Sequence, residues 1–96
     1  MNRDIVQRYV KRPVIVRAIQ FNGANVELIR QFTGGKMSAF HRKNNKFYVN
    51  TLEGLMLVGI GDYIVCGVVG EFYPVKQEIF ELTYEDVKDG FTETAV

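Results

Sequence analysis

The sequence predicts a small α+β domain: a strand, a helix, and then an antiparallel meander of four or five strands curled around that helix as a roll or partly open barrel. Three observations support this prediction. The chain has 96 residues, which suits one core and one domain, residues 1–96. One segment repeats its apolar residues with a helical period. The other apolar runs are short, rich in β-branched and aromatic residues, and bounded by turn signals.

The predicted first strand is Val14–Phe21. Pro13 favours extended backbone before it and cannot donate to a ladder, so it suits the start of a strand. Apolar residues occupy both odd and even positions of this run, which favours a central strand covered on both faces. Asn22-Gly23 indicates a turn. Ala24–Phe32 then has a helical period, and Gly34-Gly35 ends it.

The next part of the chain predicts short strands joined by tight turns. Asn44-Asn45 tolerates positive φ and suits the turn of a hairpin, and Glu53-Gly54 suits the turn of the next one. Val68-Val69-Gly70 is the predicted turn between the last two strands. Pro74 ends the final strand or marks a sheet edge. The predicted strands are Met37–Lys43, Lys46–Leu52, Leu55–Val58, Tyr63–Gly67 and Glu71–Val75.

Two further elements are predicted towards the C-terminus. Gln77–Leu82 is expected to form one or two helical turns, and Thr83–Val87 a last strand. The helical side chains expected to point inward are Ile79, Phe80 and Leu82. We expect both ends of the chain, residues 1–10 and 88–96, to be flexible.

Composition argues against several classes of protein. Twelve basic and eleven acidic residues leave a net charge of +1, so extended nucleic acid is not an expected partner. A single cysteine forbids an internal disulfide and is typical of a reducing compartment. Residues 1–10 lack the apolar core of a signal peptide or membrane anchor. We therefore expect a cytoplasmic protein with no membrane segment.

Several blocks of the sequence resemble the PGDYG-type family of uncharacterised phage and prophage proteins, over most of residues 9–85. The blocks are Tyr9-Val10-Lys11-Arg12-Pro13-Val14, Arg17-Ala18-Ile19-Gln20-Phe21, Thr51-Leu52-Glu53-Gly54, Gly61-Asp62-Tyr63-Ile64, Gly67-Val68-Val69-Gly70-Glu71-Phe72-Tyr73-Pro74, Ile79-Phe80-Glu81 and Thr83-Tyr84-Glu85. The resemblance implies a phage or prophage origin, and it supplies no activity. The chain departs from the family pattern at Ile60 and Gln77, where proline is frequent, and at Val75, where cysteine is common. If that cysteine does chemistry in relatives, this chain lacks it.

The inventory of reactive side chains is short. His41 and Cys66, with no clustered carboxylates, cannot form a closed zinc site, so no metal or cofactor is expected. Cys66 lies in an apolar strand, where a thiol behaves as a small hydrophobe. A Cys–His nucleophile pair stays open, although nothing local to either residue activates it.

Asp62 and Glu71, with Tyr63 and Tyr73 beside them, form a secondary candidate surface on the predicted hairpin. Two carboxylates serve acid–base catalysis only when burial raises the pKa of one of them. A structural role is favoured instead. In this role Asp62 holds a Gly-Asp turn, and Glu71 begins a strand and can pair with Lys76.

The principal candidate site combines Arg42, Lys43 and Lys46 with the rings of Phe40 and Tyr48. Cations neutralise phosphate and aromatic faces stack on bases, so the expected ligand is a small, flat, anionic molecule such as a nucleotide. The alternative is a charged hairpin tip that keeps a turn soluble and blocks edge pairing.

These patterns predict a non-enzymatic binding module, and the resemblance implies that it is of phage origin and acts in the host cytoplasm. It would occupy a host protein or a small signalling nucleotide, for example as an anti-defence factor. Two alternatives stay open: a structural or morphogenetic phage component, and a small enzyme with a cleft at an oligomer interface. A homodimer is expected because a short meander leaves two sheet edges, with Leu55, Leu57 and Val65 as candidate contacts if the core does not bury them.

Overall fold

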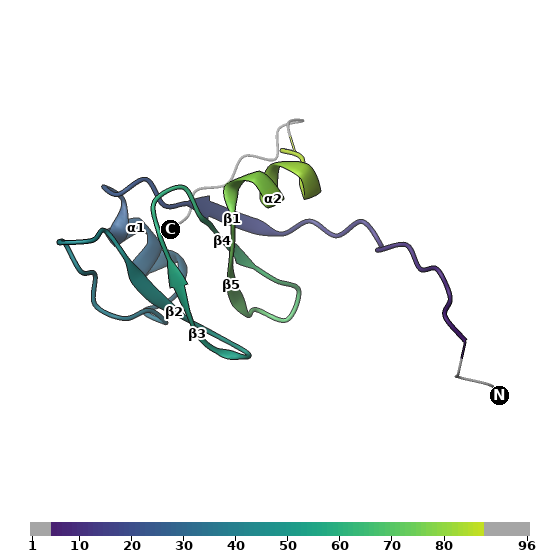
Figure 1. Cartoon of the computed structure of the whole chain (residues 1–96), viewed down its shortest axis with the longest axis horizontal. Coiled ribbons are helices and arrows are strands. Elements are labelled where there is room, and N and C mark those ends of the chain that lie inside the picture. Colours follow the sequence, from purple (N-terminus) through teal and green to yellow (C-terminus); the bar gives the residue numbers. More distant parts are fainter. Residues whose placement is uncertain (1–4, 88–96) are drawn as a thin grey trace.

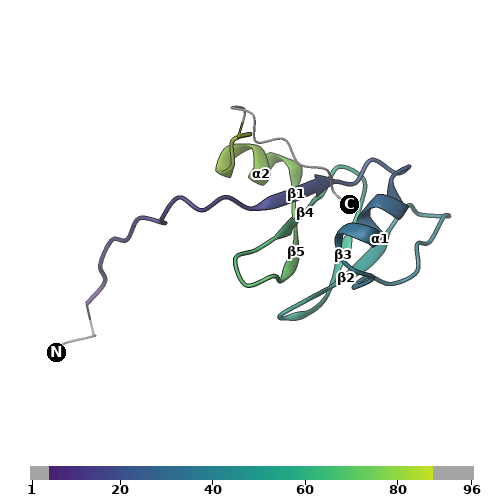
Figure 2. The same ribbon diagram turned by 180° about the vertical axis from the view of Figure 1, so that it is seen from behind.

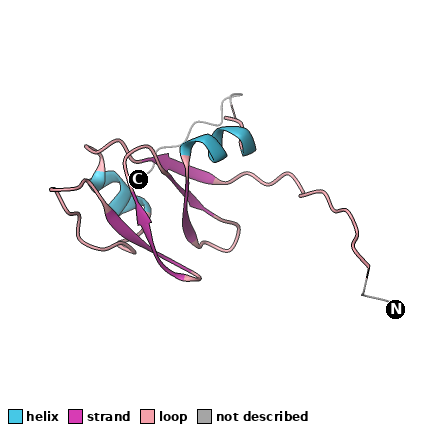
Figure 3. Cartoon of the chain, viewed as in Figure 1, coloured by secondary structure: helices cyan, strands magenta, loops and turns pink. Residues whose placement is uncertain are grey.

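The computed structural model describes residues 5–87, which contain two helices and five strands (Figures 1 and 3). In chain order they are β1 (Arg17–Gln20), α1 (Val26–Phe32), β2 (Phe47–Thr51), β3 (Gly54–Val58), β4 (Tyr63–Cys66), β5 (Phe72–Val75) and α2 (Gln77–Thr83). The α+β class and the antiparallel pairing are confirmed. The expected flexible ends lie outside the described residues at 1–4 and 88–96, and residues 5–10 form no helix or strand.

The strands form two antiparallel sheets, and neither sheet is closed within the described range. β4 is the centre of a three-stranded sheet in the order β1-β4-β5, where Val65 lies between Ala18 and Tyr73. β2 and β3 form a separate hairpin, where Phe47 lies opposite Val58. In both ribbon views α1 lies with this hairpin, and α2 lies with β1 and β5 (Figures 1 and 2).

The hydrophobic core joins α1, the β2–β3 hairpin and one face of the three-stranded sheet. Phe21 is fully buried and meets the ring of Phe47 edge-to-face, with centroids 5.0 Å apart. Phe32 of α1 meets Phe72 of β5 in the same way at 5.4 Å. Edge-to-face pairs of this kind add specific geometry to the burial of apolar area. The buried core residues are Phe21, Ile29, Phe32, Phe47, Val49, Val58, Ile64 and Phe72.

The second face of the three-stranded sheet is covered by α2. Because side chains alternate along a strand, Ile64 enters the core and Tyr63 and Val65 face the other way. The ring of Tyr63 stacks on Phe80 of α2 with centroids 3.8 Å apart. Val65 is fully buried, so the condition for its use as a dimer contact is not met.

The first strand is shorter than predicted and lies at a sheet edge. β1 begins at Arg17, and Val14 and Ile15 are exposed, so a central strand covered on both faces is wrong. The physical reason is the length of its partner. Arg17 pairs with Cys66, the last residue of β4, and the chain then turns away at Gly67. β4 therefore offers no partner to residues 14–16.

The strand predicted at Met37–Lys43 is a loop. Within it only isolated bridges form, at Met37 and His41. Between these bridges the ring of Phe40 packs against Phe21 at a centroid distance of 5.8 Å. The Tyr48 N–H donates to the Ser38 hydroxyl and not to a backbone carbonyl, so the ladder with β2 is interrupted here. The predicted Lys46–Leu52 strand is present as β2.

The C-terminal helix is confirmed as α2, with a different set of inward side chains. Phe80 packs against the sheet, whereas Ile79 and Leu82 are exposed, so the inward orientation predicted for those two residues is wrong. Seven helical residues against a narrow sheet bring only one stripe of side chains into contact. Thr83 ends this helix, and residues 84–87 form no strand.

The turn predicted at Val68-Val69-Gly70 is confirmed, and Gly70 has φ +83°. A Cβ at Gly70 meets no atom within 4 Å, so alanine there tests backbone strain alone. We expect Gly70→Ala to lower the free energy of unfolding by about 1–2 kcal/mol, because L-residues disfavour left-handed backbone. Gly59→Ala is the matched control, since its Cβ is equally uncrowded and its φ is not left-handed. Equal effects of the two variants in urea denaturation would contradict this explanation.

Candidate functional site

The cations of the predicted cluster lie on the loop of residues 41–46, ahead of β2. Arg42, Lys43 and Lys46 are all exposed. The loop is closed where the His41 N–H donates to the Lys46 carbonyl at 3.0 Å. Asn45 has φ +54°, a conformation that asparagine tolerates better than most residues. The loop therefore presents three positive charges directly to solvent.

The two aromatic rings of the same cluster are separated by the fold. Phe40 is half-buried and packs on Phe21, so it supports the core. Tyr48 is exposed on β2, and its N–H donates to the Ser38 hydroxyl at 2.9 Å. Tyr48 thus shares the exposed surface near the cations, whereas Phe40 does not.

Tyr48 belongs to an exposed, largely apolar surface of the β2–β3 hairpin. In the register of the hairpin Tyr48 lies opposite Leu57, and Asn50 lies opposite Leu55. These four residues share one side of the strand pair, because alternate positions point the same way. Leu57 is 45% exposed and Leu55 is 62% exposed. We call Tyr48, Asn50, Leu55 and Leu57 the outer hairpin face.

The edge of the same hairpin is also open. Among the described strands β3 pairs only with β2. The far side of β2 is met by the preceding loop, where the Asn50 N–H donates to the Lys36 carbonyl at 3.0 Å and the Ser38 N–H donates to the Tyr48 carbonyl at 2.8 Å. β3 therefore combines exposed apolar side chains with a sheet edge that no described strand covers.

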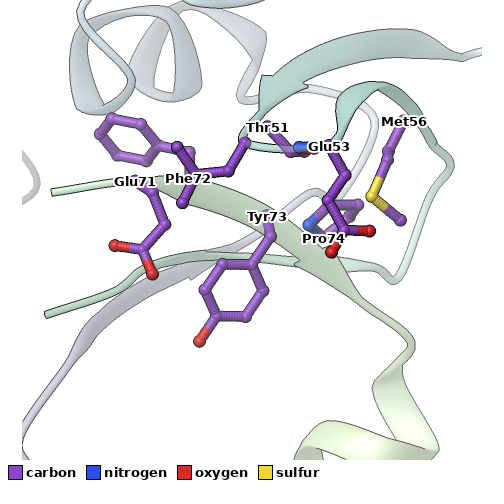
Figure 4. Close-up of a pocket in the computed structure, with 8 residues that line it drawn as sticks. Thr51, Glu53, Met56, Glu71, Phe72, Tyr73 and Pro74 are labelled. Carbon is purple, nitrogen blue, oxygen red and sulfur yellow. The ribbon is translucent and has the colours of Figure 1, made fainter. Parts of the chain in front are cut away.

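A groove lies between the turn of this hairpin and β5 (Figure 4). Its volume is about 330 Å³, and it is open to solvent. Glu53 and Met56 from the hairpin lie beside Pro74 of β5 in this view. The lining residues are Thr51, Leu52, Glu53, Met56, Glu71, Phe72, Tyr73 and Pro74. The cations of loop 41–46 do not line it.

Asp62 of the secondary surface is buried, and it holds the turn that leads into β4. Its Oδ2 accepts the Gly59 N–H at 2.9 Å and the Lys76 Nζ at 3.2 Å. The Phe21 N–H donates to the Asp62 carbonyl at 2.9 Å, which ties the same turn to the end of β1. These contacts agree with the structural role favoured for Asp62.

Glu71 lies at the other end of the β4–β5 hairpin. Its Oε1 accepts the Val69 N–H at 3.1 Å within the turn. The Gly67 N–H donates to the Glu71 carbonyl, so Glu71 lies opposite Gly67, five residues beyond Asp62. At ~3.3 Å per residue this places Asp62 and Glu71 about 16 Å apart along the hairpin. The two carboxylates therefore form no pair, and Lys76 binds Asp62 and not Glu71.

Tyr63 and Tyr73 attach α2 to the sheet. Tyr63 stacks on Phe80, which in turn stacks on Tyr84 with centroids 4.7 Å apart. The hydroxyls of Tyr73 and Tyr84 are 3.4 Å apart. Burial, and then the hydrogen bond to Tyr84, raise the pKa of Tyr73 to about 12. Tyr84 lies beyond the end of α2, in the segment predicted as a last strand, so no local sequence pattern indicates this stack.

The other reactive side chains are not assembled into a site. Cys66 is half-buried, and its Sγ lies 3.9 Å from the Gly67 carbonyl. His41 is exposed on the basic loop. Within residues 5–87 no three His, Cys, Asp or Glu side chains are grouped as metal ligands. Neither helix in this range is long and apolar enough to cross a membrane.

We expect Asp62→Ala to destabilise the protein by about 1–3 kcal/mol, because the partly buried Gly59 N–H loses its acceptor. Lys76→Ala is the matched control, since the lysine side chain is 70% exposed and an exposed partner contributes about 0–1 kcal/mol. Urea denaturation of both variants separates the two contributions. If the Asp62 variant were as stable as the Lys76 variant, the Asp62 carboxylate would not stabilise the turn before β4.

The raised pKa of Tyr73 predicts a pH dependence. The phenol is favoured over the phenolate in the folded state, so this contribution to stability is fully present below pH 10. It is lost as the pH rises from 10.0 through about 12. We expect Tyr73→Phe to flatten the fall in melting temperature across this window. A titration followed by tyrosine absorbance provides the check. If no tyrosine had a pKa above that of free tyrosine, the raised pKa of Tyr73 would be contradicted.

Comparison of the chain with protein-family models, curated proteins and solved structures finds no match. The resemblance to the PGDYG-type phage family therefore stays a prediction. The candidate site consists of the outer hairpin face with its open strand edge, next to a loop of three cations.

Proposed function

We propose that this chain is a non-enzymatic binding module of phage origin that occupies a host protein through its outer hairpin face. The observation that supports this proposal is the exposure of Tyr48, Leu55 and Leu57 together on one side of a strand pair. Contiguous exposed apolar side chains with polar neighbours are typical of protein-binding surfaces. Tyrosine adds contact area at low entropic cost.

The charges around this face specify the chemistry of the partner. Arg42, Lys43 and Lys46 are exposed on the loop that enters β2, at one end of this face, and the acidic Glu53 lies in the turn at its other end. A matching partner presents an apolar patch with an acidic rim. The rim charges steer the encounter, while the apolar centre supplies most of the binding free energy.

A protein partner agrees with this geometry better than a flat nucleotide does. Phe40, one of the two rings expected to stack on a base, is committed to the core against Phe21. The groove of Figure 4 is lined by Glu53 and Glu71, which repel an anion. A nucleotide would have to lie on the open loop with Tyr48 alone.

The non-enzymatic part of the proposal is supported by what the candidate catalytic side chains do. Asp62 holds the turn before β4, and Glu71 accepts a backbone N–H in the turn before β5. Each carboxylate is engaged in local structure at an opposite end of one hairpin. The exposed side chains of the outer hairpin face are those of a contact surface, not of a reaction centre.

The proposal also covers how the two sheets are arranged and where in the cell the protein acts. The packing of β2 against β5 supports an arrangement in which the two sheets are two parts of one roll around α1, with the outer hairpin face on its outside. The single cysteine and the resemblance to phage proteins favour the cytoplasm of the host cell, where the module acts as an anti-defence factor.

Site-specific photo-crosslinking in bacterial cells tests this proposal. A photoreactive residue at Leu57 is compared with one at Leu28 of α1, which is 44% exposed against 45% for Leu57. We expect a defined adduct with one host protein from position 57 and none from position 28. The identified partner is then purified, and its affinity is measured by calorimetry.

We expect Leu57→Glu to weaken that affinity at least about tenfold, a loss of ~1.4 kcal/mol, while Leu28→Glu leaves it unchanged. Reversal of the three charges at Arg42, Lys43 and Lys46 should slow association and reduce its dependence on salt. Adducts of two copies of the chain, or a nucleotide retained on the purified protein, would overturn the proposal. So would equal crosslinking from both positions.

A further inference from the structure

Residues 5–16 leave the body of the molecule as an extended arm (Figures 1 and 2). The arm forms no helix or strand. Its exposed large apolar side chains are Ile5, Val6, Tyr9, Val10, Val14 and Ile15. So many exposed apolar side chains in twelve consecutive residues mark a contact surface, because an isolated soluble chain rarely leaves them unpaired with another surface.

The arm and α2 carry opposite charges. Residues 5–16 contain the cations Arg8, Lys11 and Arg12 and no acidic residue. Residues 77–87, which are α2 and the segment after it, contain no basic residue. Their acidic side chains are Glu78, Glu81, Glu85 and Asp86. The two segments are therefore complementary in charge, three positive against four negative.

The outer side of α2 also has exposed apolar side chains. Ile79 is 54% exposed and Leu82 is 85% exposed, because α2 uses Phe80 to contact the sheet. An open depression of about 630 Å³ runs along this side of the helix. Its lining residues are Gln77, Glu78, Glu81 and Leu82. The outer side of α2 thus offers exposed apolar side chains flanked by glutamates. Such a surface is complementary to a segment that is both apolar and basic.

The path of the arm indicates which copy of α2 it reaches. The Lys11 Nζ lies 5.9 Å from the centroid of the Tyr84 ring, just after α2 ends. From this point residues 5–10 continue away from the body of their own chain (Figure 1). The outer half of the arm therefore does not lie on its own α2. Residues 5–10 are therefore free to contact the α2 of a second copy.

We propose that the arm of one protomer docks along the outer side of α2 of a second copy, and that the exchange is reciprocal. The same contact then occurs twice around a two-fold axis, which is the usual symmetry of a homodimer. The apolar side chains of the arm pack against Ile79 and Leu82, and its cations meet the glutamates. This dimer leaves the outer hairpin face free, so it does not depend on the proposed function.

Charge reversal tests the exchange by sedimentation velocity at low salt. The arm variant carries Arg8→Glu, Lys11→Glu and Arg12→Glu, and the helix variant carries Glu78→Lys, Glu81→Lys and Glu85→Lys. We expect the unmodified chain to be a dimer, and each variant alone to be a monomer with a dissociation constant raised at least about tenfold. An equimolar mixture of the two variants should form a heterodimer, because both of its contacts again join opposite charges.

The same triple reversal at Arg42, Lys43 and Lys46 is the matched control, and it should leave the dimer intact. High salt should weaken the dimer of the unmodified chain, since exposed charge pairs are screened. The proposal is overturned if the unmodified chain is a monomer at 100 μM, a concentration at which modest interfaces assemble. It is also overturned if either variant alone stays a dimer or if the mixture stays monomeric.

A crosslink provides a second test that does not require the charge variants to fold. Tyr9→Cys and Leu82→Cys are combined with Cys66→Ser, and the protein is oxidised under mild conditions. We expect covalent dimers on a non-reducing gel, because the two new thiols meet between copies. Disulfides formed only within single chains would show that the arm folds back on its own helix, and would refute the exchange.

Discussion

The burial of Phe21 connects the two sheets, and most of the fold depends on it. The residue directly follows β1, and its backbone exchanges hydrogen bonds with the turn before β4: its N–H reaches the Asp62 carbonyl, and its carbonyl accepts the Gly61 N–H at 2.8 Å. Its ring makes edge-to-face contacts with Phe47 of β2 and with Phe40 of the loop before β2. One fully buried residue thus couples the register of the three-stranded sheet to the position of the β2–β3 hairpin.

The local elements of this fold follow from the sequence, whereas the partners of exposed apolar residues do not. The helical period before Gly34-Gly35 and the turn at Gly70 depend on nearby residues, and both are present. The sequence predicts Val14 and Ile15 in a central strand, because apolar residues at both odd and even positions suit a strand covered on both faces. The same pattern suits an arm that is covered by another molecule, and sequence alone does not separate these two arrangements.

The candidate site shows the same division. The exposure of Arg42, Lys43 and Lys46 follows from their place in a turn, and the turn role of Asp62 follows from the Gly-Asp pair. The burial of Phe40 depends on Phe21, nineteen residues away in the chain, so no local signal predicts it. Tyr63 and Tyr73, expected on a binding surface, instead attach α2 to the sheet.

The pairing of β1 with β4 has a consequence for synthesis of the chain. Arg17 is paired with Cys66, which is forty-nine residues later, whereas β2–β3 and β4–β5 are local hairpins. At ~5–20 residues per second a ribosome needs about 2–10 s to deliver the partner strand. Contacts that close long loops form late, so the local hairpins and α1 precede the three-stranded sheet. During this interval the apolar N-terminal segment of the nascent chain is open to chaperones.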